Sequence, residues 1–112
     1  MFVNNIEPNE LVEWLKRENP PRLIDVRTPP EMMQQSIKTS ALTIEPIPLA
    51  TLPMRFSEIP KDEDVVFYCR TGARSGQACM FMAQQGYNNV YNLGGGIFNW
   101  MRQGYPVAPM SF

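Results

Sequence analysis

VVFYCRTGARS, residues 65–75, decides the fold, because an apolar run changes within it into a short loop that holds glycine. Residues 65–68 are β-branched or aromatic and follow the turn-like Pro60-Lys61-Asp62, which predicts a central strand. Ser75 is of a type that caps helices, and we expect it to cap a helix that ends at Gly86. The core face of that helix is predicted to hold Ala78, Cys79, Met82 and Ala83. Cys69 thus stands between a strand and a helix.

The rest of the chain repeats this alternation. Upstream, apolar patterning and prolines predict a helix over residues 8–15, a strand over 23–26, a short helix over 29–35, a strand over 41–44 and a brief helix over 49–56. Downstream they predict a strand over 89–93 and a last helix that contains Phe98, Trp100 and Met101. This order predicts an α/β fold with a central, mainly parallel sheet flanked by helices on both faces. Sites in such sheets form at the carboxyl ends of strands, where Cys69 is expected.

Composition excludes several classes of function. The chain has 112 residues, 44% hydrophobic and 19% charged, which is typical of a soluble globular protein, and we expect a single domain over residues 1–112. A net charge of -1 offers no basic field for nucleic acid. No apolar run approaches the ~20 residues of a membrane span, and MFVNNIEPNE lacks the layout of a signal peptide. We therefore expect a cytoplasmic protein that binds neither nucleic acid nor membranes.

The remaining chemistry is that of a thiol. Two cysteines and no histidine argue against a disulfide framework or a zinc site, so no metal or cofactor is expected. A cysteine reacts as the thiolate, which is a minor species at neutral pH when the pKa is ~8.5. Arg70, Arg74, the N–H groups of a turn made flexible by Gly72 and the helix N-terminus can all stabilise the anion beside Cys69 and hold an anionic substrate. Cys79 is interpreted as a core residue, with a resolving thiol as the lesser alternative.

The segment CRTGARSGQACMFMAQQGYNNVYNLGGGIFNW, residues 69–100, resembles the active-site loop and C-terminal half of a single-domain rhodanese, a sulfurtransferase. LIDVRTPPE, residues 23–31, is similar to the segment that follows the first helix of that family. The chain departs from the family at residues 35–41, where it reads QSIKTSA in place of the common GHIPGA. The resemblance implies a rhodanese-like α/β fold, and the departure concerns loop shape and the choice of partner.

The resemblance also implies roles for the loop residues. Cys69 would carry sulfane sulfur as a persulfide, taken from thiosulfate or a protein persulfide and passed to a thiol, a sulfur-carrier protein or cyanide. The loop residues would direct their N–H groups at the outer sulfur, and Ser75 would cap the helix behind them. The residues of this implied cradle are Arg70, Thr71, Gly72, Ala73 and Arg74.

Two other functions remain as alternatives. A cysteine-dependent phosphatase or arsenate reductase also holds a thiolate in an anion cradle. Such phosphatases place five residues between cysteine and arginine and usually have a histidine before the cysteine, whereas four residues separate Cys69 from Arg74 and Tyr68 precedes. A non-catalytic binding module on the same fold is the other alternative, and the presence of Cys69 with both arginines argues against it.

Charged and methionine residues outside the loop allow two interpretations each. Asp25 and Arg27 lie at another predicted strand end, where they could reach the site, but a structural ion pair is favoured. Several methionines do not all fit apolar stripes, and irregular core filling is favoured over a surface that receives partners. These are Met32, Met33, Met54, Met80 and Met101.

Overall fold

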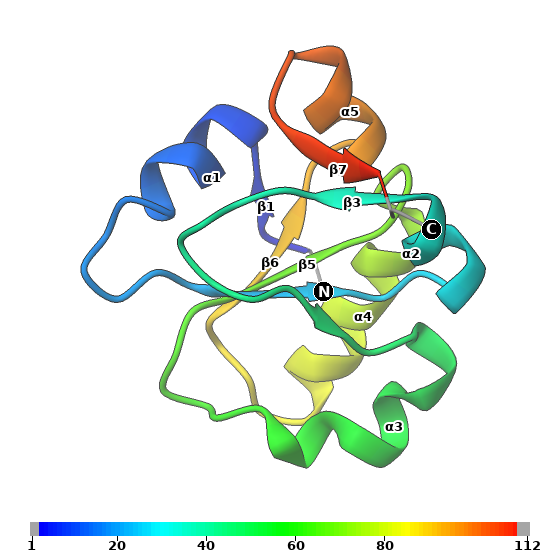
Figure 1. Ribbon diagram of the computed structural model, residues 1–112. Helices are drawn as coiled ribbons and strands as arrows, with labels where there is room; N and C mark the ends of the chain where they lie inside the picture. Colours follow the sequence, from blue (N-terminus) through cyan, green and yellow to red (C-terminus); the bar gives the residue numbers. More distant parts are fainter. Residues whose placement is uncertain (1–2, 110–112) are drawn as a thin grey trace.

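A five-stranded parallel sheet forms the centre of the computed structural model, which describes residues 3–109 (Figure 1). The strands are β1 (Asn5–Ile6), β2 (Arg22–Asp25), β4 (Glu45–Pro46), β5 (Val65–Tyr68) and β6 (Val90–Leu93), in the spatial order β1-β6-β5-β2-β4. Every neighbouring pair in this sheet is parallel. Asp25 pairs with Tyr68, so β2 and β5 end side by side. The predicted parallel sheet with β5 at its centre is confirmed.

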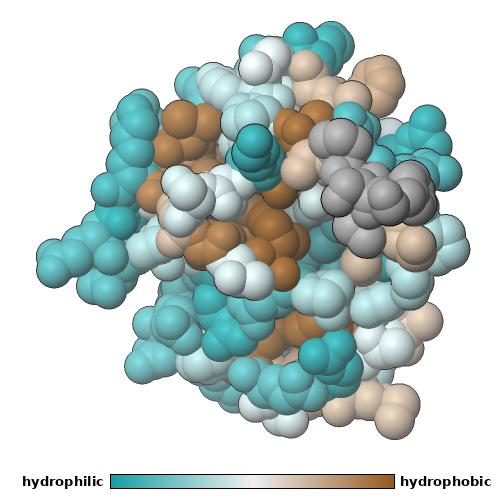
Figure 2. All heavy atoms as spheres, viewed as in Figure 1, coloured by the Kyte–Doolittle hydropathy of each residue, from teal (hydrophilic) through white to brown (hydrophobic). Residues whose placement is uncertain are grey.

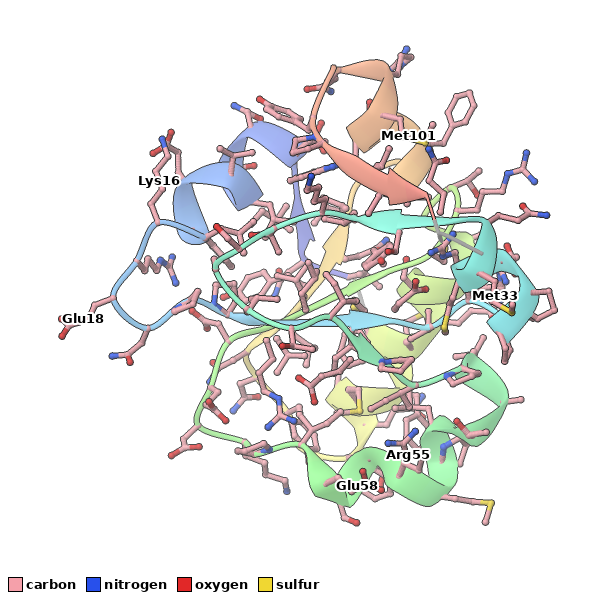
Figure 3. The ribbon with its side chains drawn as sticks, in the orientation of Figure 1. Lys16, Glu18, Met33, Arg55, Glu58 and Met101 are labelled. Carbon is pink, nitrogen blue, oxygen red and sulfur yellow. The ribbon has the colours of Figure 1, made fainter. Side chains whose placement is uncertain are left out.

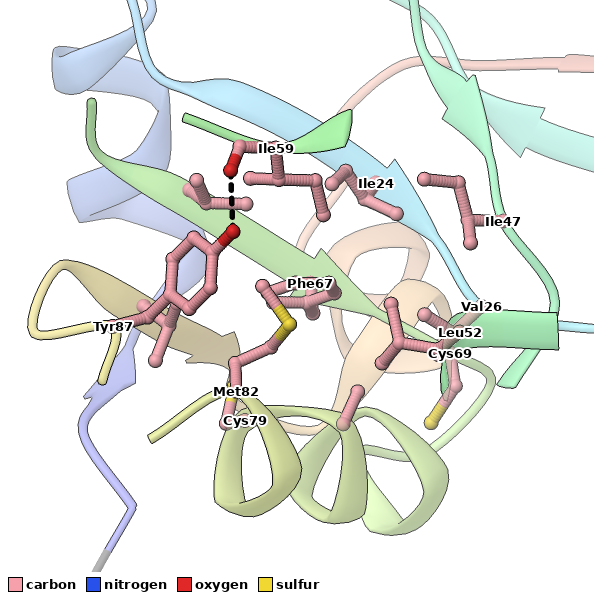
Figure 4. Packing of buried hydrophobic residues seen from close by; sticks show 13 residues of the cluster. Ile24, Val26, Ile47, Leu52, Ile59, Phe67, Cys69, Cys79, Met82 and Tyr87 are labelled. Atoms are coloured by element: carbon pink, nitrogen blue, oxygen red, sulfur yellow. Dashed lines mark hydrogen bonds between the residues drawn. The ribbon is translucent and has the colours of Figure 1, made fainter. Parts of the chain in front are cut away.

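Helices cover both faces of the sheet, as predicted (Figure 1). They are α1 (Pro8–Trp14), α2 (Pro29–Gln34), α3 (Leu52–Arg55), α4 (Ala73–Gln84) and α5 (Gly96–Arg102), with 3-10 turns at Leu49–Thr51 and Phe56–Glu58. Successive side chains of a strand point to opposite faces. Val65, Phe67 and the following Cys69 therefore pack with α4 and the α3 region (Figure 4), whereas Val66 and Tyr68 pack with α1 and α5.

Local sequence explains where α1 and α2 begin. Each starts with a proline. Proline suits this position because N–H groups in the first turn of a helix have no acceptor within the helix, so the lack of one costs nothing. In each, a glutamate three residues after the N-cap accepts a hydrogen bond from the N-cap backbone N–H: Glu10 from Glu7 at 3.0 Å and Glu31 from Thr28 at 3.2 Å. These capping boxes fix both helix starts.

The segment after α2 differs from the sequence expectation. The predicted strand over residues 41–44 is wrong: those residues form bends and coil, and the strand is the two-residue β4 that follows. Beyond β4, Ile47 N and Leu49 N still donate to Asp25 O and Val26 O, and the alternate residues Pro46 and Pro48 have no N–H to offer on the opposite side. Gln35, predicted to end a helix, instead begins β3 (Gln35–Ile37), which pairs antiparallel with β7 (Val107–Pro109). Sequence reasoning missed β1, β3 and β7.

Most of the unassigned methionines lie at the surface. Met33, Met54, Met80 and Met101 are between 39% and 86% exposed, so core filling is the wrong interpretation for these four. Met33 and Met101 project from α2 and α5 (Figure 3).

A groove lies on the face shown in Figure 2, where hydrophobic side chains gather between α1 and the segment that follows β3, with hydrophilic residues around them. Its volume is about 560 Å³, and none of its lining residues belongs to the loop after β5. The lining residues are Val12, Leu15, Lys16, Lys38, Thr39, Ser40, Ala41, Trp100, Tyr105 and Pro106.

Within residues 3–109, no helix is long and apolar enough to span a membrane.

The start of α5 is joined to the loop after β5. Ile97 N donates to Cys69 O at 2.9 Å, and Phe98 N donates to Arg70 O at 3.0 Å. Gly96 makes this approach possible: its φ is +62°, and a Cβ there would lie 2.5 Å from both carbonyl oxygens. Only glycine suits this position.

We predict that Gly96→Ala destabilises the fold more than Gly104→Ala. Gly104 also has a positive φ, +85°, but a Cβ there would meet nothing within 4 Å. Gly104→Ala isolates the backbone cost of about 1–2 kcal/mol, and the clash at Gly96 should add about 1–3 kcal/mol. Urea unfolding of both variants measures the difference, and equal losses would contradict the contact with the loop.

Candidate active site

The sulfur of Cys69 is surrounded by hydrogen-bond donors. Cys69 follows β5 directly, carries a free thiol and is 1% exposed. Its Sγ accepts hydrogen bonds from Gly72 N at 3.1 Å, Ser75 N at 3.4 Å and Ser75 Oγ at 3.3 Å. The loop therefore folds back over its own cysteine.

Gly72 makes this turn. Its φ of 101° lies in the left-handed region, and it is the N-cap of α4. The prediction that Ser75 caps the helix is wrong, because α4 begins two residues earlier, at Ala73. Ser75 lies in the first turn instead, where its backbone N–H and its hydroxyl both reach the sulfur. One residue thus supplies two of the three donors.

These donors favour the thiolate. Burial raises the pKa of Cys69, but hydrogen bonds from the Ser75 hydroxyl and from the backbone N–H groups of Ser75, Gly72 and Thr71 outweigh it and lower the pKa below its ordinary value. Cys79 is the contrasting case: it packs in the core, as predicted, and burial raises its pKa to about 12. The pKa values of the two cysteines thus differ in direction because only the sulfur of Cys69 has hydrogen-bond donors around it.

Arg74, expected to help stabilise the anion beside Cys69, donates no hydrogen bond to Cys69 Sγ. Its guanidinium is paired with Glu31 of α2, with Nη1–Oε1 and Nη2–Oε2 distances of 2.6 and 2.8 Å. The hydrogen bond to Glu31 is the main cause of its raised pKa, and the charge of Cys69 contributes less. Glu31 responds in the opposite direction, and its pKa is lowered to about 2, chiefly by Arg74. This pair clamps α2 to the start of α4.

Arg70, which follows Cys69 in the loop, has an exposed side chain without an ion-pair partner among the described residues. It is exposed, and it has no carboxylate within 4 Å among residues 3–109. Thr71 and Ala73 are exposed beside it. Arg70 lines a cavity of about 300 Å³ whose other lining residues are Arg27, Glu31, Gln34, Gln35, Ile97, Phe98 and Met101. Of the charged residues in this lining, Arg27 and Glu31 are paired with Asp25 and Arg74, and Arg70 is the one without a carboxylate within 4 Å among the described residues.

Asp25 and Arg27 form the favoured structural ion pair. Both are buried, and Arg27 Nη2 lies 2.6 Å from Asp25 Oδ2. The same nitrogen donates to Gln35 O at 2.6 Å, which ties β2 to the start of β3. Arg27 also reaches the cavity that Arg70 lines. The pair supports the wall of the site.

Sequence reasoning missed Asn92. This residue of β6 is 8% exposed; its Oδ1 accepts from Ser75 Oγ at 2.5 Å and its Nδ2 donates to Gly72 O at 3.0 Å. The signal was an amide within the predicted strand 89–93, next to the apolar Leu93 and near the carboxyl end. A polar side chain at such a position is buried only when it has partners.

Together these residues prepare a nucleophile. A thiol held by converging donors can react as its anion without a neighbouring base. Arg70, the next residue, lines a cavity that does not include Cys69 in its lining, and its unpaired guanidinium can bind a small anion there. The site therefore suits chemistry in which sulfur attacks an anionic molecule.

Comparison with known proteins gives consistent relatives. The family model described as "Rhodanese-like domain" matches residues 7–103. A protein named "Sulfurtransferase" from Allochromatium vinosum is 47% identical over 107 residues, which cover 96% of each chain. The probable adenylyltransferase/sulfurtransferase MoeZ of Mycobacterium tuberculosis is 32% identical over 96% of this chain, which spans 27% of the MoeZ length. The crystal structure of a rhodanese-related protein from Thermoplasma volcanium superposes with a TM-score of 0.81 at 31% identity, covering 95% of this chain and 98% of that one.

We predict that iodoacetamide alkylates Cys69 in the folded protein and leaves Cys79 unmodified at pH 8. A lowered pKa increases the thiolate fraction near neutral pH, so the rate should reach half its maximum below the ~8.5 of a free thiol. Intact mass against time, from pH 5 to 10, gives the profile, and Cys79→Ala should leave it unchanged. A midpoint equal to that of free cysteine would contradict the role of the donors.

We also predict that Glu31→Gln lowers stability at pH 7 by about 1 kcal/mol, since the pair is partly exposed. The pKa of Glu31 falls from 4.5 to about 2 on folding, so its contribution is present above pH 4.5 and is lost as the pH falls toward 2. Urea unfolding from pH 7 to 2 should show the two proteins converging. Glu58→Gln, which removes the exposed pair with Arg55 (Figure 3), is the control. A difference that persists at pH 2 would contradict this assignment.

Proposed function

The chain belongs to the rhodanese-like domain family, and on that basis we propose that it is a sulfurtransferase whose Cys69 carries sulfane sulfur as a persulfide. The observation that carries the proposal is the set of hydrogen bonds that Gly72 and Ser75 donate to Cys69 Sγ. They favour a thiolate nucleophile where no histidine exists to act as a base.

The proposed donor is thiosulfate or a protein persulfide. With thiosulfate, the Cys69 thiolate attacks the outer sulfur, a sulfur–sulfur bond forms to Cys69, and the thiosulfate bond breaks as sulfite leaves with the electron pair. The unpaired Arg70 and the cavity of about 300 Å³ favour such an anionic donor. No proton has to be removed in this step.

The proposed acceptor is cyanide, a thiol or a sulfur-carrier protein. Its nucleophilic atom attacks the outer sulfur of the persulfide, and Cys69 leaves as a thiolate with the electron pair. The donors around Sγ stabilise the leaving group as they stabilise the attacking one. MoeZ, which is named for both adenylyl and sulfur transfer, makes a protein acceptor the more interesting case. The cycle needs Cys69 reduced, which suits a reducing compartment such as the cytoplasm.

We predict that incubation with thiosulfate, without reductant, adds one sulfur atom to the protein and that cyanide removes it. Cys69→Ser should abolish the gain, because no other thiol has donors around it. Cys79→Ala should keep it, since burial holds Cys79 neutral. Intact-mass spectrometry measures all three proteins, and equal loss in both variants would give Cys79 a part in the reaction.

An aryl phosphate assay addresses the phosphatase alternative. Four residues between Cys69 and Arg74 leave a ring that suits one sulfur atom better than a phosphoryl group, so no hydrolysis that depends on Cys69 is expected. The bidentate pair with Glu31 also occupies two of the N–H donors with which Arg74 could bind a phosphate. Hydrolysis by the wild-type protein and not by Cys69→Ser would overturn sulfur transfer as the proposed reaction.

A further inference from the structure

The hydroxyl of Ser75 lies between two acceptors. Its Oγ is 3.3 Å from Cys69 Sγ and 2.5 Å from Asn92 Oδ1. A hydroxyl carries one hydrogen, so it donates to one of the two at a time. Ser75 is fully buried and Asn92 is 8% exposed, and no other donor among residues 3–109 reaches Asn92 Oδ1. The two acceptors therefore compete for one hydrogen.

The amide of Asn92 has a fixed orientation. The carbonyl of Gly72 accepts from Asn92 Nδ2 at 3.0 Å, and a carbonyl can only accept. The NH₂ group must therefore face Gly72, which leaves Oδ1 facing Ser75. Through these two contacts Asn92 touches both the residue that turns the loop and the residue that donates to the sulfur.

We propose that Asn92 is a positioning residue for Cys69. Its Nδ2 donates to the Gly72 carbonyl, and its Oδ1 accepts the hydrogen bond of the Ser75 hydroxyl whenever the sulfur of Cys69 is uncharged. The second action rests on the proposed persulfide cycle. The first stands on the contacts alone. Neither makes Asn92 a catalytic residue, because it does not touch the reacting atoms.

The competition follows the charge on the sulfur. While Cys69 is a thiolate, the charge-assisted hydrogen bond from Ser75 to Sγ is the stronger one. Once Cys69 holds sulfur, its Sγ is bonded to carbon and to the outer sulfur, and the charge lies on the outer atom. The hydroxyl then turns to Asn92 Oδ1. When the acceptor takes the outer sulfur, the electron pair returns to Sγ and the hydroxyl turns back to it.

An amide suits this position better than a carboxylate. Aspartate would offer no donor to Gly72 O, would hold the Ser75 hydrogen more strongly and would place a negative charge close to the thiolate. Leucine or alanine would leave the Gly72 carbonyl without its partner. Asparagine supplies a donor on one side and a moderate acceptor on the other.

A double-mutant cycle tests the shared hydrogen. The variants are Ser75→Ala, Asn92→Ala and the two combined, and the readout is the pKa of Cys69 from the pH dependence of its alkylation by iodoacetamide. Ser75→Ala should raise this pKa by about one unit, because the thiolate loses a donor. Asn92→Ala also removes the hydrogen bond to Gly72 O, but it does so both in the protein with Ser75 and in the protein with Ser75→Ala. The effect of that loss on the pKa therefore cancels in the cycle.

The remaining coupling isolates the competition. When Ser75 is present, Asn92→Ala frees the hydroxyl hydrogen for the sulfur of Cys69. The change in the Cys69 pKa caused by Asn92→Ala should therefore be about half a unit lower in the protein with Ser75 than in the protein with Ser75→Ala. Asn92→Asp should give coupling of the opposite sign, since the carboxylate captures the hydrogen, while its charge acts in both backgrounds. Asn89→Ala, which removes an amide bonded to Lys61 O before the other end of β6, should leave the profile unchanged.

Equal pKa changes in both backgrounds would overturn the proposal, because a purely structural asparagine predicts them. If Asn92→Ala does not fold, the near-isosteric Asn92→Asp completes the cycle alone. Sulfur loading from thiosulfate is measured on the same proteins. Coupling without loading would refute the proposed function and leave the positioning of the thiol intact, whereas loading without coupling would refute the shared hydrogen only.

Discussion

A buried sulfur anion has to be surrounded by donors, and this requirement shapes the centre of the molecule. Cys69 is 1% exposed, so its thiolate has little water around it. The donors come from the loop and from the first turn of α4, through Gly72 N and the backbone N–H and hydroxyl of Ser75. For them to converge, Gly72 must adopt a left-handed conformation and α4 must begin at Ala73. The strand, the turn and the first turn of the helix thus form one unit with the sulfur at its centre.

Three neighbouring elements hold that unit in place without touching the sulfur. Glu31 of α2 grips Arg74, the N-terminus of α5 donates to the carbonyls of Cys69 and Arg70, and Asn92 of β6 holds the carbonyl of Gly72. Each contact uses a group that the donors to the sulfur leave free, namely a side chain or a backbone carbonyl. The loop that carries Cys69 is therefore held by residues distant in the sequence, among them Glu31, which is 43 residues from Arg74. None of these three contacts uses the side chain of Arg70, which is exposed to solvent.

Sequence reasoning succeeded where one physical signal dominates. The apolar run of residues 65–68 and the alternation around it predict the central strand and the parallel sheet, and the position of Cys69 at its end follows. It failed where two signals compete. Ser75 looks like a helix cap, but Gly72 takes that place and leaves the serine for the sulfur. Arg74 looks like an anion ligand, yet Glu31, distant in sequence, pairs with it. Asn92 carries no motif, because its importance comes from contacts across the fold.

The outermost strands of the sheet have a consequence for self-association. A strand at the edge of a sheet exposes unpaired N–H and C=O groups on which another chain can align. Here both edges, β1 and β4, are two residues long, and in β4 one of the two is Pro46, which has no N–H to offer. A neighbouring copy finds almost no backbone template on either side. Within residues 3–109, the sheet that carries Cys69 at its carboxyl end thus offers little backbone on which a second copy could extend it.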